Sequence, residues 1–172
     1  MHFPLHPDTP PEGLLLTDLF AGRERQIGEM QDRLARLAEA EGLPYRNRER
    51  TYNSRLAQEL AEWAESRGVS AIHDALFRAY FAEGENIGDP EVLAEVAQRV
   101  GLPADEAREV LASRSFSPAV DRDWRRSREL GITGVPTFVA GRYAVVGAQP
   151  YEQLERLVLE AGAVPREGSE SR

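Results

Sequence analysis

The sequence predicts an α/β fold in which a small sheet carries a large helical insertion. Three observations predict it. From about Leu14 to Leu130, apolar residues recur at spacings of three and four, as they do on one face of a helix. After Gly131, two short β-rich runs flank Gly141, which predicts a hairpin, and an amphipathic helix follows them. Near the start, the alternation of side chains over residues 3–5 predicts one short strand.

Glycine and proline divide the helical part into separate helices, because proline cannot continue a helix and glycine favours its end. Asp89 followed by Pro90 is a strong start, since aspartate caps free N–H groups and proline suits the first helical position. The predicted helices are residues 23–41, a helix from Asn53-Ser54 through Trp63, residues 69–80, residues 90–100, a short helix after Pro103, residues 118–129 and residues 151–161.

This order divides the chain into three parts. Residues 1–13 and 131–164 are predicted to form the sheet portion, and residues 14–130 the inserted helical domain. Residues 165–172 are polar and lack periodicity, so we expect a frayed tail there.

The composition excludes several functions. The 172 residues carry 21 arginines, no lysine and 29 acidic residues, a net charge of −8, which argues against binding to nucleic acid. No apolar run approaches the ~18 residues of a membrane helix, and no secretory signal opens the sequence, so we expect a soluble, cytoplasmic chain. Without cysteine, this polypeptide alone cannot carry out disulfide, thiolate or zinc–cysteine chemistry.

The segment that carries most functional information is Gly134-Val135-Pro136-Thr137. A proline directly before a β-run suits a strand start, because its missing N–H breaks no ladder bond. With a trans bond this is an ordinary junction between a loop and a strand. With a cis bond, which occurs in only ~5–6% of X-Pro bonds, Val135 would present its N–H and C=O outward, where an extended peptide can pair with them.

The run GITGVPTFVAGRYAVVGAQP with its terminal helix resembles the C-terminal half of DsbA-like, thioredoxin-fold oxidoreductases, specifically the FrnE-like subgroup. The resemblance continues through FPLHPDTPPEG, HDALFRAYFAEGENIGDPEVLAEVAQRVGL and the helix before Gly131. It implies a thioredoxin-like sheet with an inserted helical domain, and a thiol–disulfide oxidoreductase parent. It further implies that Pro136 is the family's cis-proline and that Gly134, Val135 and Pro136 bind an extended peptide or protein substrate.

The chain also departs from this family. The family begins with a β-strand and a Cys-x-x-Cys at a helix N-terminus, whereas this sequence begins at the second strand, which resembles residues 2–5. We therefore expect a truncated or start-site variant, or a remnant with another function, and no cofactor. In the family's sheet the missing strand lies beside the strand at residues 137–139. We expect that vacancy to be filled by strand exchange in a homodimer, or by rearrangement within the chain.

Two alternative functions stay open beside a redox-inactive member of the oxidoreductase family. One is a peptide-binding or chaperone-like module that uses the edge at Val135-Pro136. The other is a relative of the 2-hydroxychromene-2-carboxylate isomerases and kappa-class glutathione transferases, which resemble this family in fold and proline loop. Their activating residue belongs to the same missing helix, and glutathione binding would distinguish them.

Other candidate groups are interpreted as structural or solvated. No metal site is expected, because a site would need several ligands from unlinked places: His2 and His6 flank a short strand-like run, His73 lies far away in a helix, and Asp8 is the only nearby carboxylate. Charge clusters with interleaved glutamates are typical of an exposed mixed-charge face. The residues considered for a metal site and rejected are His2, His6, His73 and Asp8. We assign Asp121 and Asp123 to the solvated surface, residues 46–50 and 125–128 to exposed mixed-charge faces, and Trp63, Phe77 and Tyr80 to the core.

Overall fold

The computed structural model describes residues 1–164, and the chain divides into two compact units. One unit runs from His2 to Trp124, and the other comprises Met1 and the chain from Arg125 onward. The prediction of a frayed tail at 165–172 lies outside the described residues. In the part of the chain that is described, no helix is long and apolar enough to cross a membrane.

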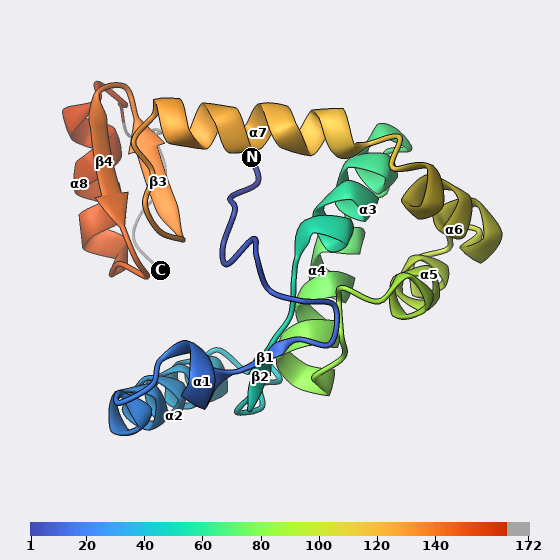
Figure 1. The fold of residues 1–172 in the computed structure, drawn as a ribbon. Helices are drawn as coiled ribbons and strands as arrows, with labels where there is room; N and C mark the ends of the chain where they lie inside the picture. The colour runs from blue at the N-terminus through green and yellow to red at the C-terminus, as the bar shows by residue number, and fades with distance from the viewer. Residues whose placement is uncertain (165–172) are drawn as a thin grey trace. The chain divides into compact units, whose positions relative to one another are not determined.

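The first unit is mostly helical, and its helices begin and end close to the predicted positions (Figure 1). A two-residue strand pair was not predicted: Leu14 pairs with Thr51 and Leu15 with Arg50. In chain order the elements are β1 (Leu14–Leu15), α1 (Leu16–Leu19), α2 (Glu24–Ala40), β2 (Arg50–Thr51), α3 (Arg55–Ser66), α4 (Ile72–Phe77), η1 (Arg78–Glu83), α5 (Pro90–Arg99), α6 (Ala104–Ser113) and α7 (Ser117–Glu129), which continues into the second unit.

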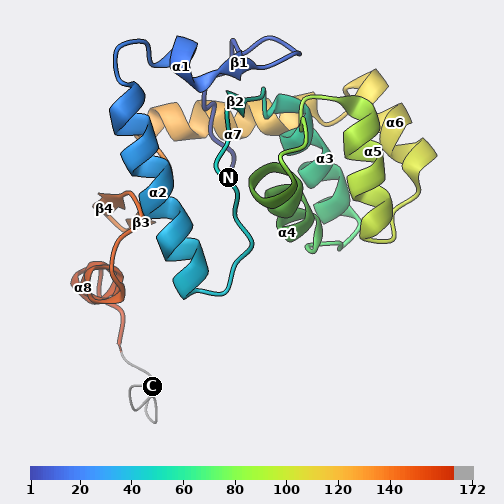
Figure 2. The ribbon, with the colours of Figure 1, turned by 90° about the horizontal axis from the view of Figure 1, so that it is seen from below.

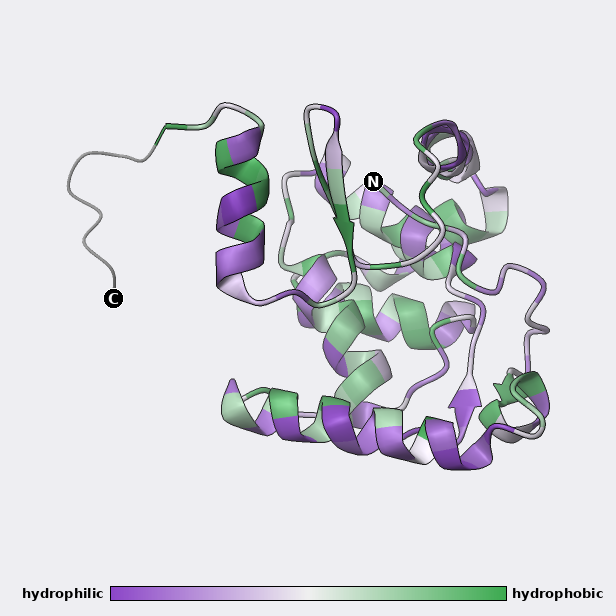
Figure 3. Ribbon diagram, turned by 90° about the vertical axis from the view of Figure 1, so that its left-hand side faces the viewer, coloured by the Kyte–Doolittle hydropathy of each residue, from purple (hydrophilic) through white to green (hydrophobic). Residues whose placement is uncertain are grey.

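The core of this unit lies between α3, α4, α5 and α6, which pack against one another. Its most deeply buried large side chains are Leu60, Ile72, Leu93 and Val96, none of which is exposed to solvent. Helix α2 differs, because of its apolar residues only Ile27 is buried. Hydrophobic and hydrophilic residues both occur along α2 (Figure 3). Figures 1 and 2 both show α2 separated from the group of α3 to α6.

One of the three predicted core aromatic residues lies elsewhere. Trp63 is buried and Tyr80 is half-buried against the core, as predicted. Phe77 is 61% exposed, so the prediction for it is wrong. Neighbouring helical residues point about 100° apart, and Leu76 takes the position facing the core. Phe77 instead stacks on Phe81, with ring centroids 6.0 Å apart.

The predicted strand at residues 3–5 is also wrong. The carbonyl of Phe3 accepts the N–H of Leu5 at 3.0 Å and the side-chain amide of Gln58 at 3.1 Å, so these residues form a local turn instead of a ladder. The following proline-rich segment is fixed in the helical unit by two asparagines. Asn53 donates to the carbonyls of Pro7 and Thr9, and Asn86 donates to that of Pro11.

These bonds place residues 2–13 with the helices, whereas the sequence assigned them to the sheet portion. The reason is physical. Proline lacks the N–H that a ladder needs, and the carbonyls of this segment find side-chain donors on the helical unit instead.

The second unit contains the predicted hairpin and final helix: β3 (Thr137–Ala140), β4 (Tyr143–Val146) and α8 (Tyr151–Glu160). Helix α8 packs on both strands and buries Leu157 against them. The strands are joined by two residues, Gly141 and Arg142. Gly141 has a φ of +60°, at the position where a type II′ turn requires glycine.

Candidate functional site

The predicted binding segment lies directly before β3 and is held by hydrogen bonds on either side of its proline. The Val135–Pro136 peptide bond is cis. The hydroxyl of Thr137 donates to the carbonyl of Gly134 at 2.6 Å, and the N–H of Gly147 donates to the carbonyl of Pro136 at 2.8 Å. The loop is therefore fixed to the end of β4.

Val135 is the exposed residue of this loop. The residue is 50% exposed. Its backbone N–H and C=O form no hydrogen bond with another residue of the described chain. Unpaired backbone groups at a surface are available to a ligand. Of the three predicted site residues, Gly134 and Pro136 use their carbonyls in the hydrogen bonds given above. Val135 is the one whose backbone N–H and C=O are both unpaired within the described chain.

The bond from Gly147 to Pro136 also fixes which way the groups of β3 point. In an antiparallel ladder, hydrogen-bonded pairs alternate with non-bonded pairs. Since Pro136 is bonded to Gly147, the next bonded residue of β3 is Phe138, opposite Val145. Thr137 and Val139 therefore direct their N–H and C=O groups away from β4.

This outer edge of β3 has no strand beside it among residues 1–164, where β3 pairs only with β4. Apolar side chains flank it, since Phe138 is 39% exposed and Val139 is 47% exposed. An unpaired edge with apolar side chains is a template for an added strand. Chemically, the arrangement can bind an extended backbone.

Residues 1–158 match the family described as DSBA-like thioredoxin domain. The chain belongs to this family. Among solved structures, it is similar to the probable DsbA oxidoreductase SCO1869 from Streptomyces coelicolor, with a TM-score of 0.81 and 36% identity. That similarity covers 96% of this chain and 76% of the other. The thioredoxin-like fold class with an inserted helical part is thereby confirmed, and the family is one of thiol–disulfide oxidoreductases.

Two further similarities were found, one to a solved structure and one to a protein sequence. A solved structure from Nitrosomonas europaea has a TM-score of 0.62 at 19% identity and covers 84% of this chain and 78% of its own; it supports the fold alone. The uncharacterized protein YwbO of Bacillus subtilis (strain 168) is 31% identical over 84 residues. The chain covers 42% of the length of that relative, and the matched part is 48% of this chain.

The family's exchange reaction needs a thiolate, which attacks a disulfide to form a mixed disulfide. None of the 172 residues is a cysteine. These 172 residues therefore cannot form the mixed disulfide by themselves.

Within residues 1–164, the structure brings together three side chains that could hold a metal ion, a grouping that the sequence did not predict. Ligand atoms of His2, Glu62 and Asp123 all lie within 4.8 Å of one another. Of the four residues considered from the sequence, only His2 belongs to this cluster, and His6, His73 and Asp8 do not. His2 Nε2 is 3.3 Å from Glu62 Oε1, and the N–H of His2 donates to Asp123 Oδ2 at 2.5 Å.

Burial has opposite effects on two members of this cluster. It lowers the pKa of His2, because the charged imidazolium loses solvation, and it raises the pKa of Glu62, to which the nearby Asp123 adds. A neutral imidazole beside carboxylates is the donor set that Zn²⁺ accepts. Sequence spacing gave no signal for it, since the three residues come from distant segments.

The remaining predicted groups are separated by the fold. Asp121 and Asp123 face different partners, because Asp121 is 2.7 Å from the Arg55 guanidinium while Asp123 lies beside His2. Arg125, Arg126 and Arg128 are exposed, as predicted for a solvated mixed-charge face. The three arginines within residues 46–50 line a pocket, which is described below.

Proposed function

We propose that this chain binds extended peptides along the outer edge of β3, as the substrate-binding portion of a FrnE-like member of its family. One observation carries the proposal: Val135, Thr137 and Val139 form a row of backbone groups that β4 does not use. A peptide strand added beside β3 would pair with this row. The exposed side chains of Phe138 and Val139 would contact the residues of the peptide.

In this proposal, affinity comes from the backbone and is therefore tolerant of peptide sequence. Each backbone hydrogen bond contributes about 0.5–1.5 kcal/mol net, so a few such bonds with apolar contacts give weak, reversible binding. A protein that acts on many unfolded substrates needs this property. Thiol–disulfide exchange also requires a dithiol, and none of the 172 residues is a cysteine. We further propose that the protein acts in the cytoplasm.

The test uses fluorescently labelled, reduced and carboxymethylated ribonuclease A, an unfolded protein whose thiols are blocked. Binding is followed by fluorescence anisotropy. Val139→Pro removes an N–H that points away from β4 and leaves the β3–β4 ladder intact. We expect it to weaken binding about fivefold, which corresponds to about 1 kcal/mol for one hydrogen bond.

Val146→Pro is the matched control. Val146 lies opposite Thr137, so its N–H points to the far edge of β4, and at 52% it is as exposed as Val139. We expect this variant to bind as the unmodified chain does. Equal losses in the two variants, or no binding of the unfolded protein at all, would contradict the proposal. Binding of glutathione in place of the unfolded protein would favour the isomerase and transferase relationship.

A further inference from the structure

Three arginines of one short segment line a single pocket of about 360 Å³ in the helical unit. Arg46, Arg48 and Arg50 lie two residues apart along the chain segment between α2 and α3, and Tyr52 and Tyr80 complete the apolar part of the wall. Pockets of this size hold small ligands. The sequence predicted an exposed mixed-charge face for this segment, and Arg46, Glu49 and Arg50 are exposed while Arg48 is half-buried. The structure adds that the three arginines line one space.

Arg46 is held in place by the end of η1. Its backbone N–H donates to the carbonyl of Phe81 at 2.9 Å, and its Nη2 donates to the carbonyl of Glu83 at 2.7 Å. The guanidinium lies directly over Gly84. A Cβ at Gly84 would come within 1.7 Å of Nη2, so only glycine leaves room for this position of Arg46.

Arg48 is fixed by aromatic rings. Its guanidinium lies 4.3 Å from the centroid of Tyr80 and 4.9 Å from that of Phe81, and its backbone N–H donates to Gln31 Oε1 at 2.6 Å. The Nε atom is buried and has no hydrogen-bond partner in the described chain. Because Nε is buried, a ligand in the pocket cannot reach it. The terminal nitrogens of Arg48 make no hydrogen bond within residues 1–164, and they are the donors that this residue can offer to a ligand.

The pocket carries an excess of positive charge. Arg50 makes only long contacts, of 3.4 and 3.5 Å, to the backbone carbonyls of Gly13 and Glu12. Within residues 1–164, none of the three arginines forms a salt bridge, and Glu49 is the single acidic residue among those that line the pocket. The lining therefore has a net charge of 3 − 1 = +2, in a chain whose net charge is −8.

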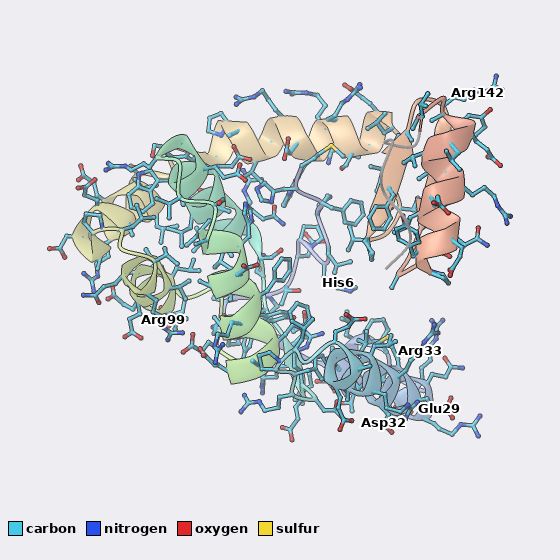
Figure 4. All side chains as sticks on the ribbon, turned by 180° about the vertical axis from the view of Figure 1, so that it is seen from behind. His6, Glu29, Asp32, Arg33, Arg99 and Arg142 are labelled. Carbon is cyan, nitrogen blue, oxygen red and sulfur yellow. The ribbon has the colours of Figure 1, made fainter. Side chains whose placement is uncertain are left out.

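Other arginines of the helical unit differ from these three, because carboxylates of the same unit pair with their guanidinium groups. Arg99, labelled in Figure 4, contacts the carboxylates of Glu83 and Glu85, and Arg114 contacts that of Glu59. In the pocket, backbone carbonyls and aromatic rings orient the guanidinium groups and leave further N–H donors unused. A guanidinium has five donors in a planar fork, which fits phosphate or carboxylate oxygens.

We propose that this pocket binds a small organic anion, whose phosphate or carboxylate group is held between Arg46, Arg48 and Arg50 and whose body contacts Tyr52 and Tyr80. The site is formed by residues of the helical unit alone and does not depend on the peptide-binding proposal. Phosphate and carboxylate share the same recognition chemistry here, and the experiment distinguishes them.

The test titrates the full chain with inorganic phosphate, phenyl phosphate and benzoate and follows the arginine Nε–H signals by NMR. We expect the Arg48 Nε–H signal to shift on binding, because an anion at the terminal nitrogens changes the electric field across the whole guanidinium group. Phenyl phosphate should bind more tightly than inorganic phosphate, because the tyrosines add apolar contact. A greater affinity for benzoate than for phenyl phosphate identifies a carboxylate as the preferred group, and the reverse identifies a phosphate.

The double variant Arg46→Gln with Arg50→Gln should weaken binding by at least about tenfold, since each charged hydrogen bond is a large part of a small ligand's affinity. The control is Arg33→Gln with Arg36→Gln, which removes the same charge from the exposed side of α2 (Arg33 is labelled in Figure 4). We expect no more than a twofold change for the control. Equal losses in both double variants would show that only overall charge matters, and would overturn the proposal.

A second variant keeps the test decisive if the first one unfolds. Glu49→Gln leaves the three arginines intact and removes the negative charge beside them, so it should strengthen binding severalfold at low salt. Glu41→Gln, an exposed residue after α2, changes the same charge outside the pocket and should leave the affinity unchanged. An unchanged or weaker affinity in Glu49→Gln, or an Arg48 signal that does not respond to any of the three anions, would also overturn the proposal.

Discussion

Arg114 holds Glu59 by two hydrogen bonds across 55 residues of the chain: Nε donates to Oε2 at 2.8 Å, and Nη2 donates to Oε1 at 2.7 Å. The Glu59 side chain is 1% exposed, and Arg55 Nε adds a third bond at 2.7 Å. Arg114 reaches this position from the left-handed conformation, with a φ of +54°, at the end of α6. The hydrogen bond to Glu59 raises the pKa of Arg114. The pair joins α3 to the turn between α6 and α7.

Replacing Glu59 with glutamine should lower the free energy of unfolding by about 3 kcal/mol, because two guanidinium groups lose their buried counter-charge. The estimate is at the lower end of the range for such pairs since Arg114 is 48% exposed and can recruit water. Urea denaturation followed by circular dichroism measures it. Glu109→Gln, an exposed residue of α6, is the control and should change stability by less than about 0.5 kcal/mol. A loss below 1 kcal/mol in Glu59→Gln would show that the pair is not a stabilising contact.

The sequence contains a signal for this buried carboxylate, namely the spacing of Glu59 from the apolar residues of the same helix. Glu59 lies three residues after Leu56 and four before Trp63, so helical geometry places it on the buried face of α3. A charged residue on a buried face requires a partner. One partner, Arg55, lies four residues earlier on the same helix, where local spacing identifies it. The other, Arg114, comes from 55 residues away in the chain, and no local pattern identifies it.

Elsewhere, features that depend on residues close together in the sequence could be predicted, and features that depend on distant residues could not. Helix boundaries depend on local residues such as Asp89, whose side chain accepts the N–H of Glu91 at 2.9 Å, and they were predicted well. The pairing of Leu14 with Thr51 was missed because a two-residue strand has no periodicity. Residues 3–5 alternate like a strand, yet strand formation depends on a neighbour, which the turn at Phe3 replaces.

For the candidate site, the segment was predictable and its detail was not. The sequence identified Gly134, Val135 and Pro136 through their resemblance to a family. The outward direction of Thr137 and Val139 depends on the register with β4, which is fixed by contacts across the hairpin. A shift by one residue would have directed these groups toward β4 instead.

We expect Asn53 to hold the proline-rich N-terminal segment against the helical unit. It donates to the carbonyls of Pro7 and Thr9 at 2.8 and 3.1 Å and accepts the N–H of Arg55 at 2.9 Å. Asn53→Ala removes all three bonds, so we expect a loss of about 2–3 kcal/mol in the free energy of unfolding. Backbone amide exchange should show faster exchange of the Thr9 N–H in this variant.

Asn47→Ala provides the comparison for Asn53. Asn47 is exposed and makes one long side-chain contact, 3.4 Å to Asp32 Oδ1. It should change stability by less than about 0.5 kcal/mol. If the two asparagine variants are equally stable, the carbonyls of the proline-rich segment are satisfied by water, and Asn53 has no special role.

Glu83 is expected to titrate below its ordinary pKa of 4.5, because the hydrogen bond from Arg99 at 2.6 Å favours the carboxylate. A lowered pKa in the folded state stabilises the fold above pH 4.5, and that contribution is lost as the pH falls below 4.5 through the folded pKa. Arg99→Gln should raise the pKa of Glu83 toward 4.5, as measured by carboxyl ¹³C NMR. Arg78→Gln should have a smaller effect, since its bond to Glu83 is longer, at 3.2 Å. The reverse order would contradict this assignment.

The outer edge of β3 should also pair with a second copy of the chain, since an edge that binds extended peptides will bind another strand when peptide is absent. Amide hydrogen exchange resolves this residue by residue. The N–H of Phe138 faces β4 and should exchange slowly at every protein concentration, whereas that of Val139 should exchange fast in dilute solution and become protected as the concentration rises. Sedimentation over the same range should show a dimer appear with that protection. Val139→Pro should abolish the dimer and Val146→Pro should retain it. A chain that remains monomeric at millimolar concentration, with Val139 still exchanging fast, would exclude self-association through β3 while leaving peptide binding to be measured directly.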